Sequence, residues 1–75
     1  MIQLIYKVNE KCYNTLLAAM MHSGHGDFIY LFVGSTSEMP FSGRSYKKAS
    51  YQWVKDTLFL FGYHWKQEKG KEYAI

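Results

Sequence analysis

A chain of 75 residues with one cysteine has to be held together by a single hydrophobic core. A chain this short leaves no room for a second domain, and it buries only about 60% of the surface that its unfolded form exposes. A lone cysteine forms no internal disulfide, which favours a reducing, cytoplasmic setting. The core must come from the apolar 48% of the residues, which include seven Tyr, five Phe and two Trp. We expect residues 1–75 to form one small domain.

Two apolar segments have the pattern of strands. Residues 2–8 alternate with period two, and one face carries Ile2, Leu4, Tyr6 and Val8. Residues 28–34, FIYLFVG, are apolar on both faces, as in an interior strand covered on at least one side. A loop rich in turn residues follows and contains the only proline. A further short strand around Phe41 is left open.

A helix is expected over residues 10–22, between these two segments. Asn9 has the chemistry of an N-cap, because its side chain can accept from the first free amides. Glu10 suits the first turn, where the helix dipole favours an acid, and Gly24 can end the helix. Cys12 is expected on the buried side as an unreactive thiol.

A second helix is expected over residues 45–61. Gly62 follows as its C-terminal stop. Its core stripe is predicted to consist of Tyr46, Ala49, Trp53, Val54, Thr57, Leu58 and Phe61. Residues 63–75 alternate as a hairpin, with Lys69 and Gly70 near the turn.

These elements follow in the order β-α-β-α-β-β and predict an α+β fold. The simplest packing is a two-layer sandwich, in which a small, mostly antiparallel sheet carries two helices on one face. The first residues lack the basic region and the cleavage site of a secretory signal. No apolar run approaches the roughly 18 residues of a membrane-spanning helix. We therefore expect a cytoplasmic protein with no membrane partner.

Positive charge is concentrated in the second half of the chain. Residues 44–75 hold seven of the nine Lys and Arg residues and three of the six acids, whereas residues 1–43 are slightly acidic. This asymmetry indicates a polyanionic partner. The alternative is that lysines on a helix face and in a hairpin turn keep a small domain soluble.

The side of the second helix opposite its predicted core stripe combines cations with aromatic rings. Residues three or four apart line up along a helix, and this side carries Arg44, Lys48, Tyr51, Gln52, Lys55 and Phe59. Cations neutralise phosphates and rings stack on unpaired bases. With the neighbouring and hairpin lysines, the candidate binding residues are Arg44, Lys47, Lys48, Tyr51, Lys55, Phe59, Lys66, Lys69 and Lys71. The alternative is that Tyr51 and Phe59 are core residues beneath the hairpin or the long loop.

Patterns typical of catalysis or metal binding are weak. His22, His25 and Asp27 are of types that bind transition metals, but a helix end and a glycine-rich turn separate them, so the spacing does not impose convergence. The acids are scattered, and Cys12 would meet a histidine base only through the tertiary fold. We expect no enzyme activity, no cofactor and no bound metal, and the metal question at these three residues stays open.

The C-terminal third of the chain, VKDTLFLFGYHWKQEKGKEYAI, resembles a small module of phage- and plasmid-encoded proteins. In that module a helix ends in a leucine and a glycine, and an aromatic–x–Trp strand, a charged turn, a lysine and an aromatic residue follow. The matching residues are Leu58, Gly62, Tyr63, Trp65, Lys71 and Tyr73; the turn is one residue longer here. The hairpin is also similar to that of HARP-type domains attached to DNA-annealing helicases. The resemblance implies a mobile-element accessory protein that works near DNA or a nucleoprotein complex, in the host cytoplasm if a phage encodes it.

Three functions fit these features. The first is a small non-catalytic protein that binds nucleic acid or a nucleic-acid-processing protein complex through its basic, aromatic C-terminal half. The second is a protein-binding inhibitor of a host defence enzyme, anti-CRISPR-like or another anti-defence protein, which acts by surface blockade. The third is a homodimer whose aromatic residues form the interface. We take the first as the leading hypothesis.

Overall fold

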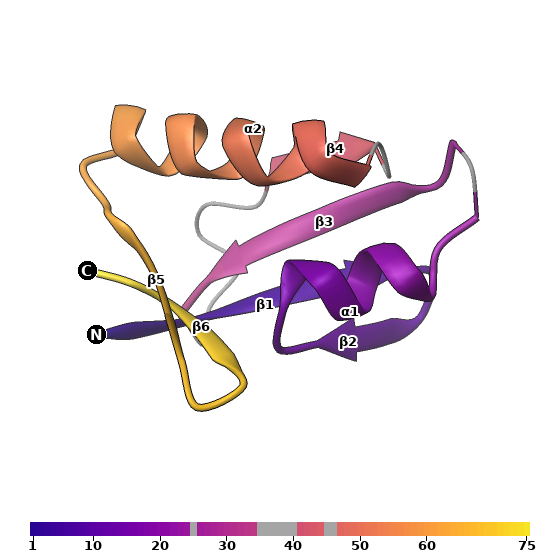
Figure 1. Cartoon of the computed structure of the whole chain (residues 1–75), viewed down its shortest axis with the longest axis horizontal. Coiled ribbons are helices and arrows are strands. Elements are labelled where there is room, and N and C mark those ends of the chain that lie inside the picture. Colours follow the sequence, from indigo (N-terminus) through magenta and orange to yellow (C-terminus); the bar gives the residue numbers. More distant parts are fainter. Residues whose placement is uncertain (25, 35–40, 45–46) are drawn as a thin grey trace.

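The computed structural model describes residues 1–24, 26–34, 41–44 and 47–75, with the side chains of residues 41–44 and 47–50 outside this description. The elements are β1 (Ile2–Val8), β2 (Lys11–Tyr13), α1 (Leu16–Met21), β3 (Phe28–Val33), β4 (Phe41–Arg44), α2 (Lys47–Leu60), β5 (Trp65–Glu68) and β6 (Lys71–Ala74). In Figure 1, α2 lies along the top, α1 lies beside β1 and β2, and the β5–β6 hairpin lies at the lower left.

The sheet is antiparallel, and β1 is its central strand. The strand order is β4-β3-β1-β6-β5, and β2 pairs with β1 off this path. The start of β1 pairs with β6, with Ile2 opposite Ala74, and its end pairs with β2. Along its other edge β1 pairs with β3, with Ile5 opposite Phe32. The predicted α+β class and antiparallel sheet are confirmed, and β2 and β4 are two strands more than the predicted order contained.

The core combines one set of alternating strand residues with residues of both helices. Its buried apolar members are Leu4, Tyr6, Val8, Leu16, Ala19, Ile29, Leu31, Val33, Val54, Leu58 and Ala74. The strand predicted over residues 28–34 is interior, because β3 lies between β1 and β4. Its alternate residues Phe28 and Tyr30 are exposed, so this strand is buried fully on one face only.

The helix predicted over residues 10–22 is wrong in its first half. Asn9 does not cap a helix; its φ of 50° is left-handed, which asparagine tolerates, and the chain reverses there. β2 then pairs back on β1. The helix begins after Thr15, whose side-chain oxygen accepts a hydrogen bond from the backbone nitrogen of Ala18 at 3.1 Å. Cys12, on β2, is exposed and not buried as predicted.

The second helix begins and ends close to the predicted residues. Gly62 follows α2 with a φ of 87°, a conformation that glycine adopts without strain. Arg44, which was expected to line up with the helix, instead lies in β4, where its backbone is opposite Phe28. None of the helices in the described parts of the chain is long and apolar enough to cross a membrane.

The buried stripe of α2 is rotated about the helix axis from its predicted position. Val54 and Leu58 are buried as predicted, and Tyr51 packs against the same core. Trp53 and Phe61, both predicted to be in the stripe, are exposed. Residues three and seven positions apart share one helix side, so the stripe runs through Tyr51, Val54 and Leu58.

β5 and β6 form the predicted C-terminal hairpin. Lys69 and Gly70 occupy its turn with φ values of 52° and 74°. Two residues with positive φ between paired strands have the geometry of a type I′ turn. The backbones of His64 and Ile75 exchange two hydrogen bonds, of 3.0 and 2.9 Å, and so extend the pairing beyond the strands.

Candidate binding groove

Trp65 on β5 lies between a buried polar network and the surface. Its indole Nε1 donates to Oε2 of Glu72 at 3.1 Å and to the hydroxyl of Tyr6 at 3.3 Å. The Tyr6 hydroxyl in turn donates to the same carboxylate oxygen. The backbone nitrogen of Leu16 donates to the other oxygen at 3.1 Å. One side chain of β6 thus joins β1, β5 and the start of α1.

Burial controls the protonation of this network. The carboxyl of Glu72 is fully buried, and burial raises its pKa, although the bonds from Tyr6, Leu16 and Trp65 oppose the rise. Burial, with the nearby charge of Glu72, also raises the pKa of Tyr6, so the phenol keeps its proton. The carboxyl does not reach solvent, and its hydrogen bonds hold β1, β5, β6 and the start of α1 together.

Tyr51 belongs to the packing of α2. Its ring meets the Trp65 ring edge to face, with the centroids 6.0 Å apart and the planes at 85°. Burial raises the pKa of Tyr51 from its ordinary value. This corrects the predicted position of Tyr51 on the side of α2 away from the core, and its part in binding stays a prediction.

A shallow groove of about 520 Å³ lies between the C-terminal half of α2 and the start of the hairpin. Its lining residues are Lys55, Asp56, Phe59, Tyr63, His64 and Trp65. The Nζ atom of Lys55 is 5.0 Å from the centroid of the Trp65 ring, within cation–π range. Phe59 is 66% exposed, and its ring meets that of His64 at 5.9 Å. The structure thus brings together Lys55 and Phe59, two of the predicted binding residues.

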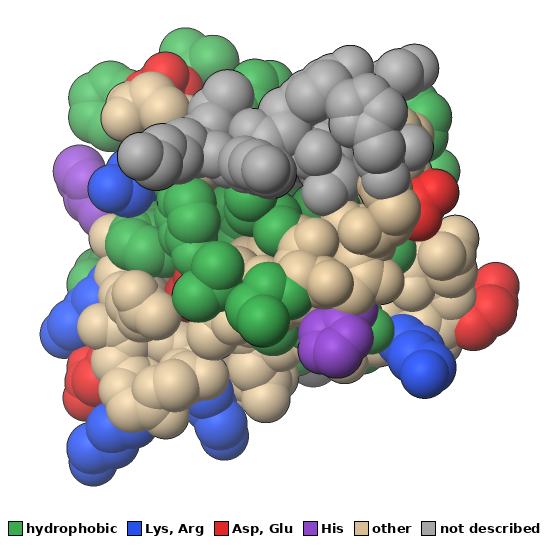
Figure 2. Space-filling model, turned by 45° about the vertical axis from the view of Figure 1, so that its right-hand side comes forward, with side chains coloured by type: hydrophobic (Ala, Val, Ile, Leu, Met, Phe, Trp, Pro, Cys, Tyr) green, Lys and Arg blue, Asp and Glu red, His purple; other side chains and the backbone are tan. Residues whose placement is uncertain are grey.

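The hairpin lysines lie beyond the groove. Lys66 forms an ion pair of 3.3 Å with Glu68, and both side chains are partly exposed. Lys69 and Lys71 are exposed at and after the turn. In Figure 2, lysine side chains occur at the lower left, where the hairpin turn lies in Figure 1. The side chains of Arg44, Lys47 and Lys48 fall outside the described residues.

The histidine-rich turn after α1 is closed by its own hydrogen bonds. Oδ2 of Asp27 accepts from the backbone nitrogen of Gly24 at 2.7 Å, and the backbone nitrogen of Asp27 donates to the Gly24 carbonyl at 3.1 Å. His25 lies outside the described residues. Among the residues that the structure describes, no three His, Cys, Asp or Glu side chains gather as a metal site.

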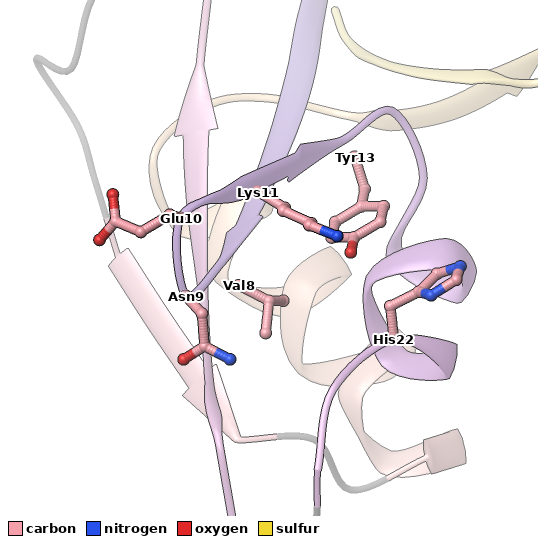
Figure 3. A pocket seen from close by; sticks show the side chains of 6 residues that line it. All are labelled: Val8, Asn9, Glu10, Lys11, Tyr13 and His22. Atoms are coloured by element: carbon pink, nitrogen blue, oxygen red, sulfur yellow. The ribbon is translucent and has the colours of Figure 1, made fainter.

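The ring of His22 faces the first hairpin. It stacks on Tyr13 with the centroids 5.2 Å apart and the planes at 8°. Both rings line a hollow of about 350 Å³, together with Val8, Asn9, Glu10 and Lys11. Figure 3 shows the carboxylate of Glu10 pointing away from the other side chains of this hollow.

The sequence interpretation missed the inner wall of the groove. The sequence pattern indicates His64 and Trp65 only as part of the hairpin over residues 63–75. Their position just after Gly62 is the signal that could have found them, because a glycine stop turns the chain back along the helix. A strand that follows such a stop at once has to pass the last turns of α2.

The comparisons with known proteins show no similar protein: no family model, no curated protein and no solved structure matches the chain. The groove therefore has to be interpreted from its own chemistry. The resemblance of the C-terminal third to mobile-element modules stays a prediction.

Proposed function

We propose that the protein is a small non-catalytic binding protein that holds a nucleic-acid strand in the groove between α2 and the hairpin. The observation that carries this proposal is an exposed ring beside a cation in one groove. Phe59 offers a face for stacking, and Lys55, held over Trp65, offers a positive charge to a phosphate. The hairpin lysines are not part of this groove, because Lys66 and Lys71 lie on the face of the sheet opposite Trp65 and Lys69 lies in the turn.

The proposal takes the fold as a two-layer sandwich with both helices on one face of the sheet. The shared core supports this, because α1 and α2 both contribute to it. In that arrangement the groove opens at the edge of the sheet, since β5 is the last strand in the order. A strand at an edge leaves room for a ligand that extends beyond the domain.

Asp56 sets the direction in which a polyanion would lie. Its Oδ1 accepts from Nε2 of Gln52 at 2.8 Å, which holds the carboxylate along the helix. A negative charge at this rim repels phosphates. We therefore expect the phosphates on the side of Lys55, and the bases toward Phe59.

The test is fluorescence anisotropy with labelled single-stranded DNA and RNA oligonucleotides. Phe59→Ala should weaken binding at least about fivefold, since stacking contributes about 1–3 kcal/mol per base. Leu60→Ala is the matched control, because Leu60 is an exposed apolar neighbour that does not line the groove. Affinity should fall steeply with salt as phosphate contacts release counterions. Absence of binding at micromolar protein, or equal losses in the two variants, would contradict the proposal.

A protein partner is the second candidate, and the end of α2 favours it. Leu60 is 83% exposed and Phe61 54% exposed, and in Figure 2 hydrophobic side chains gather at the upper left, over this end. Exposed aromatic and aliphatic residues are typical of interaction surfaces. If the protein inhibits a host defence enzyme by surface blockade, Leu60→Asp should abolish binding to that enzyme. The same substitution should change nucleic-acid binding in the groove little. Pull-down from host extract with and without nuclease separates the two.

A homodimer is the third candidate from the sequence. The same exposed end of α2 would supply its interface, since a domain this small gains by burying a face. Light scattering over a dilution series tests it against the chain mass of 8.8 kDa. A mass that stays at that value at high concentration removes this candidate.

A further inference from the structure

The sheet has a second face, which the core does not use. On β1 the buried residues alternate with Gln3, Ile5 and Lys7, and on β3 with Phe28, Tyr30 and Phe32. Cross-strand register places Ile5 opposite Phe32 and Lys7 opposite Tyr30. Because successive strand side chains point to opposite faces, these residues form one continuous surface, which we call the aromatic sheet face.

The composition of the aromatic sheet face differs from that of an ordinary solvated sheet surface. A solvated face of an antiparallel sheet is usually polar, whereas here Tyr30 is 44% exposed and Phe32 and Ile5 are half-buried. β6 adds Tyr73, which lies between Gln3 and Lys66 in the register. The face thus offers several rings in one plane of side chains.

The charges on this face are mainly positive. Lys7 lies beside Tyr30, and Lys66 and Lys71 lie on the same side of the hairpin as Tyr73. The acid on this side of the hairpin is Glu68, which is paired with Lys66. Glu10 lines the hollow beside Lys7, so the charges around the rings are three lysines and two acids, an excess of one positive charge.

A hollow lies at one end of the aromatic sheet face. It measures about 310 Å³, and its lining residues are Lys7, Asn9, Glu10, Tyr30 and Phe32. Tyr30 and Phe32 are two residues apart on β3, so about 7 Å separates them along the strand. That spacing gives each ring room for its own planar ligand group.

We propose that the aromatic sheet face binds single-stranded nucleic acid, with unpaired bases stacked on Tyr30 and Phe32 and a phosphate at Lys7. Planar rings with cations beside them match a ligand that alternates planar bases with negative phosphates. Bases within a duplex are already stacked on each other, so the rings select single strands. This surface lies apart from the groove at Phe59, and its occupation does not depend on that proposed site.

The experiment measures binding of a labelled 12-nucleotide oligo(dT) and of a duplex of the same length by anisotropy. Tyr30→Leu keeps an apolar side chain on the strand but removes the ring plane, and it should weaken oligo(dT) binding at least about fivefold. Phe61→Leu is the matched control, because Phe61 is an exposed ring on neither surface. Affinity should fall less steeply with salt for Lys7→Gln, with the magnitude of the negative slope of log affinity against log salt reduced by about 0.7.

Amide NMR spectra separate this proposal from the groove proposal. Oligo(dT) should shift the signals of β3 and of Lys7, and the circular dichroism spectrum of Tyr30→Leu should match that of the unaltered protein. If Phe59→Ala weakens binding and Tyr30→Leu does not, the inference about the sheet face is overturned and the groove is retained. If only Tyr30→Leu weakens binding, the groove proposal fails instead. Duplex affinity equal to that for oligo(dT), or no binding of either, overturns the inference.

Discussion

A carboxyl group without exposure to solvent, such as that of Glu72, is costly to bury unless donors surround it. Three neutral donors do so here, from Tyr6, Trp65 and the backbone of Leu16. They belong to elements that are far apart in the sequence. The loss of this one side chain would leave several buried donors unsatisfied, at about 1–3 kcal/mol for each.

Glu72 should give the protein a characteristic pH dependence. The pKa of Glu72 is raised on folding, so the folded state binds the proton more tightly than the unfolded state does. This contribution to the free energy of unfolding reaches its full value below about pH 4.3, the ordinary pKa of a glutamate. That stability is lost as the pH rises through the raised value. Relative to Glu72→Gln, the unaltered protein should therefore become less stable from pH 4 to pH 7 in urea denaturation. A relative gain over that range would contradict this assignment.

The hydroxyl of Tyr6 should matter more than other tyrosine hydroxyls. Tyr6→Phe removes a donor to the buried Glu72 carboxylate and should lower the free energy of unfolding by about 1–3 kcal/mol. Tyr30→Phe is the control, since Tyr30 is exposed, and it should change stability by about 0.5 kcal/mol or less. Urea denaturation at neutral pH measures both. Equal losses in the free energy of unfolding for the two variants would show that the Tyr6 hydroxyl contributes no more to stability than an exposed tyrosine hydroxyl does.

At the scale of elements, two turns determine where one strand ends and the next begins. Asn9 reverses the chain between β1 and β2, and Lys69 with Gly70 reverses it between β5 and β6. Both turns contain a non-glycine residue with positive φ, a conformation that costs energy unless asparagine or glycine supplies it. Substitutions at these positions test the boundaries of the elements directly.

The start of α1 can be tested with a pair of variants. Thr15→Ala removes the side-chain oxygen that caps the helix and should cost about 0.5–2 kcal/mol in the free energy of unfolding. Asn9→Gly should be neutral or stabilising, because glycine adopts the left-handed conformation freely. A helix that began at residue 10 would give no loss for Thr15→Ala. Thermal and urea denaturation of both variants decide between the two starts.

A substitution in the hairpin turn should increase the stability of the protein. Lys69→Asn places the preferred residue before glycine in a type I′ turn and should raise stability by up to about 1 kcal/mol. Gly70→Ala should lower it, since its φ is 74° and a Cβ would meet nothing within 4 Å, which leaves conformational strain as the cause. Denaturation curves of the two variants should shift in opposite directions. A shift in the same direction would contradict the turn type.

The sequence predicted the elements whose signals are local. The alternation of residues 2–8, Gly62 after α2 and the turn at Lys69 each depend on a few neighbouring residues, and all three predictions are confirmed. Asn9 was misinterpreted because asparagine suits both a helix cap and a left-handed turn. The choice between them depends on the pairing of β2 with β1, which sequence periodicity does not reveal.

The binding surfaces were harder to predict for the same reason. Tyr51, Trp53 and Phe61 are comparable aromatic residues, and which of them is buried depends on where the hairpin packs against α2. The groove at Phe59 needs Trp65 from β5, so it exists only in the tertiary structure. Lys55 and Phe59 on the α2 side of the groove were predicted from the sequence, whereas Asp56 and the wall formed by Tyr63, His64 and Trp65 were not.

At the scale of the whole molecule, the buried apolar residues in the described parts of the chain form one core. The radius of gyration is 11.0 Å, close to the value of about 11 Å expected for a compact chain of this length. A single core predicts one cooperative unfolding transition. Far-ultraviolet and near-ultraviolet circular dichroism should therefore give coincident melting curves. Separate midpoints would indicate that the hairpin unfolds on its own.

Leu58→Ala tests how thin the stability margin is. Leu58 is fully buried in the core, and its truncation should cost about 2–5 kcal/mol. In a domain of this size each kcal/mol lowers the melting temperature by about 4–8 °C. Leu60→Ala, at an exposed position of the same helix, should leave the midpoint within a few degrees. Similar midpoints for both variants would contradict the position of the core.

The central place of β1 has a consequence for synthesis on the ribosome. β1 is synthesised before the other strands of this sheet, and its Ile2 pairs with Ala74 of β6, the last strand. Glu72 reaches its donors only when β6 has been made. Until that point the nascent polypeptide carries an unfinished sheet with an open edge, which is prone to aggregate. We expect the domain to fold late, after translation has passed residue 75, and to profit from chaperones that shield the growing chain.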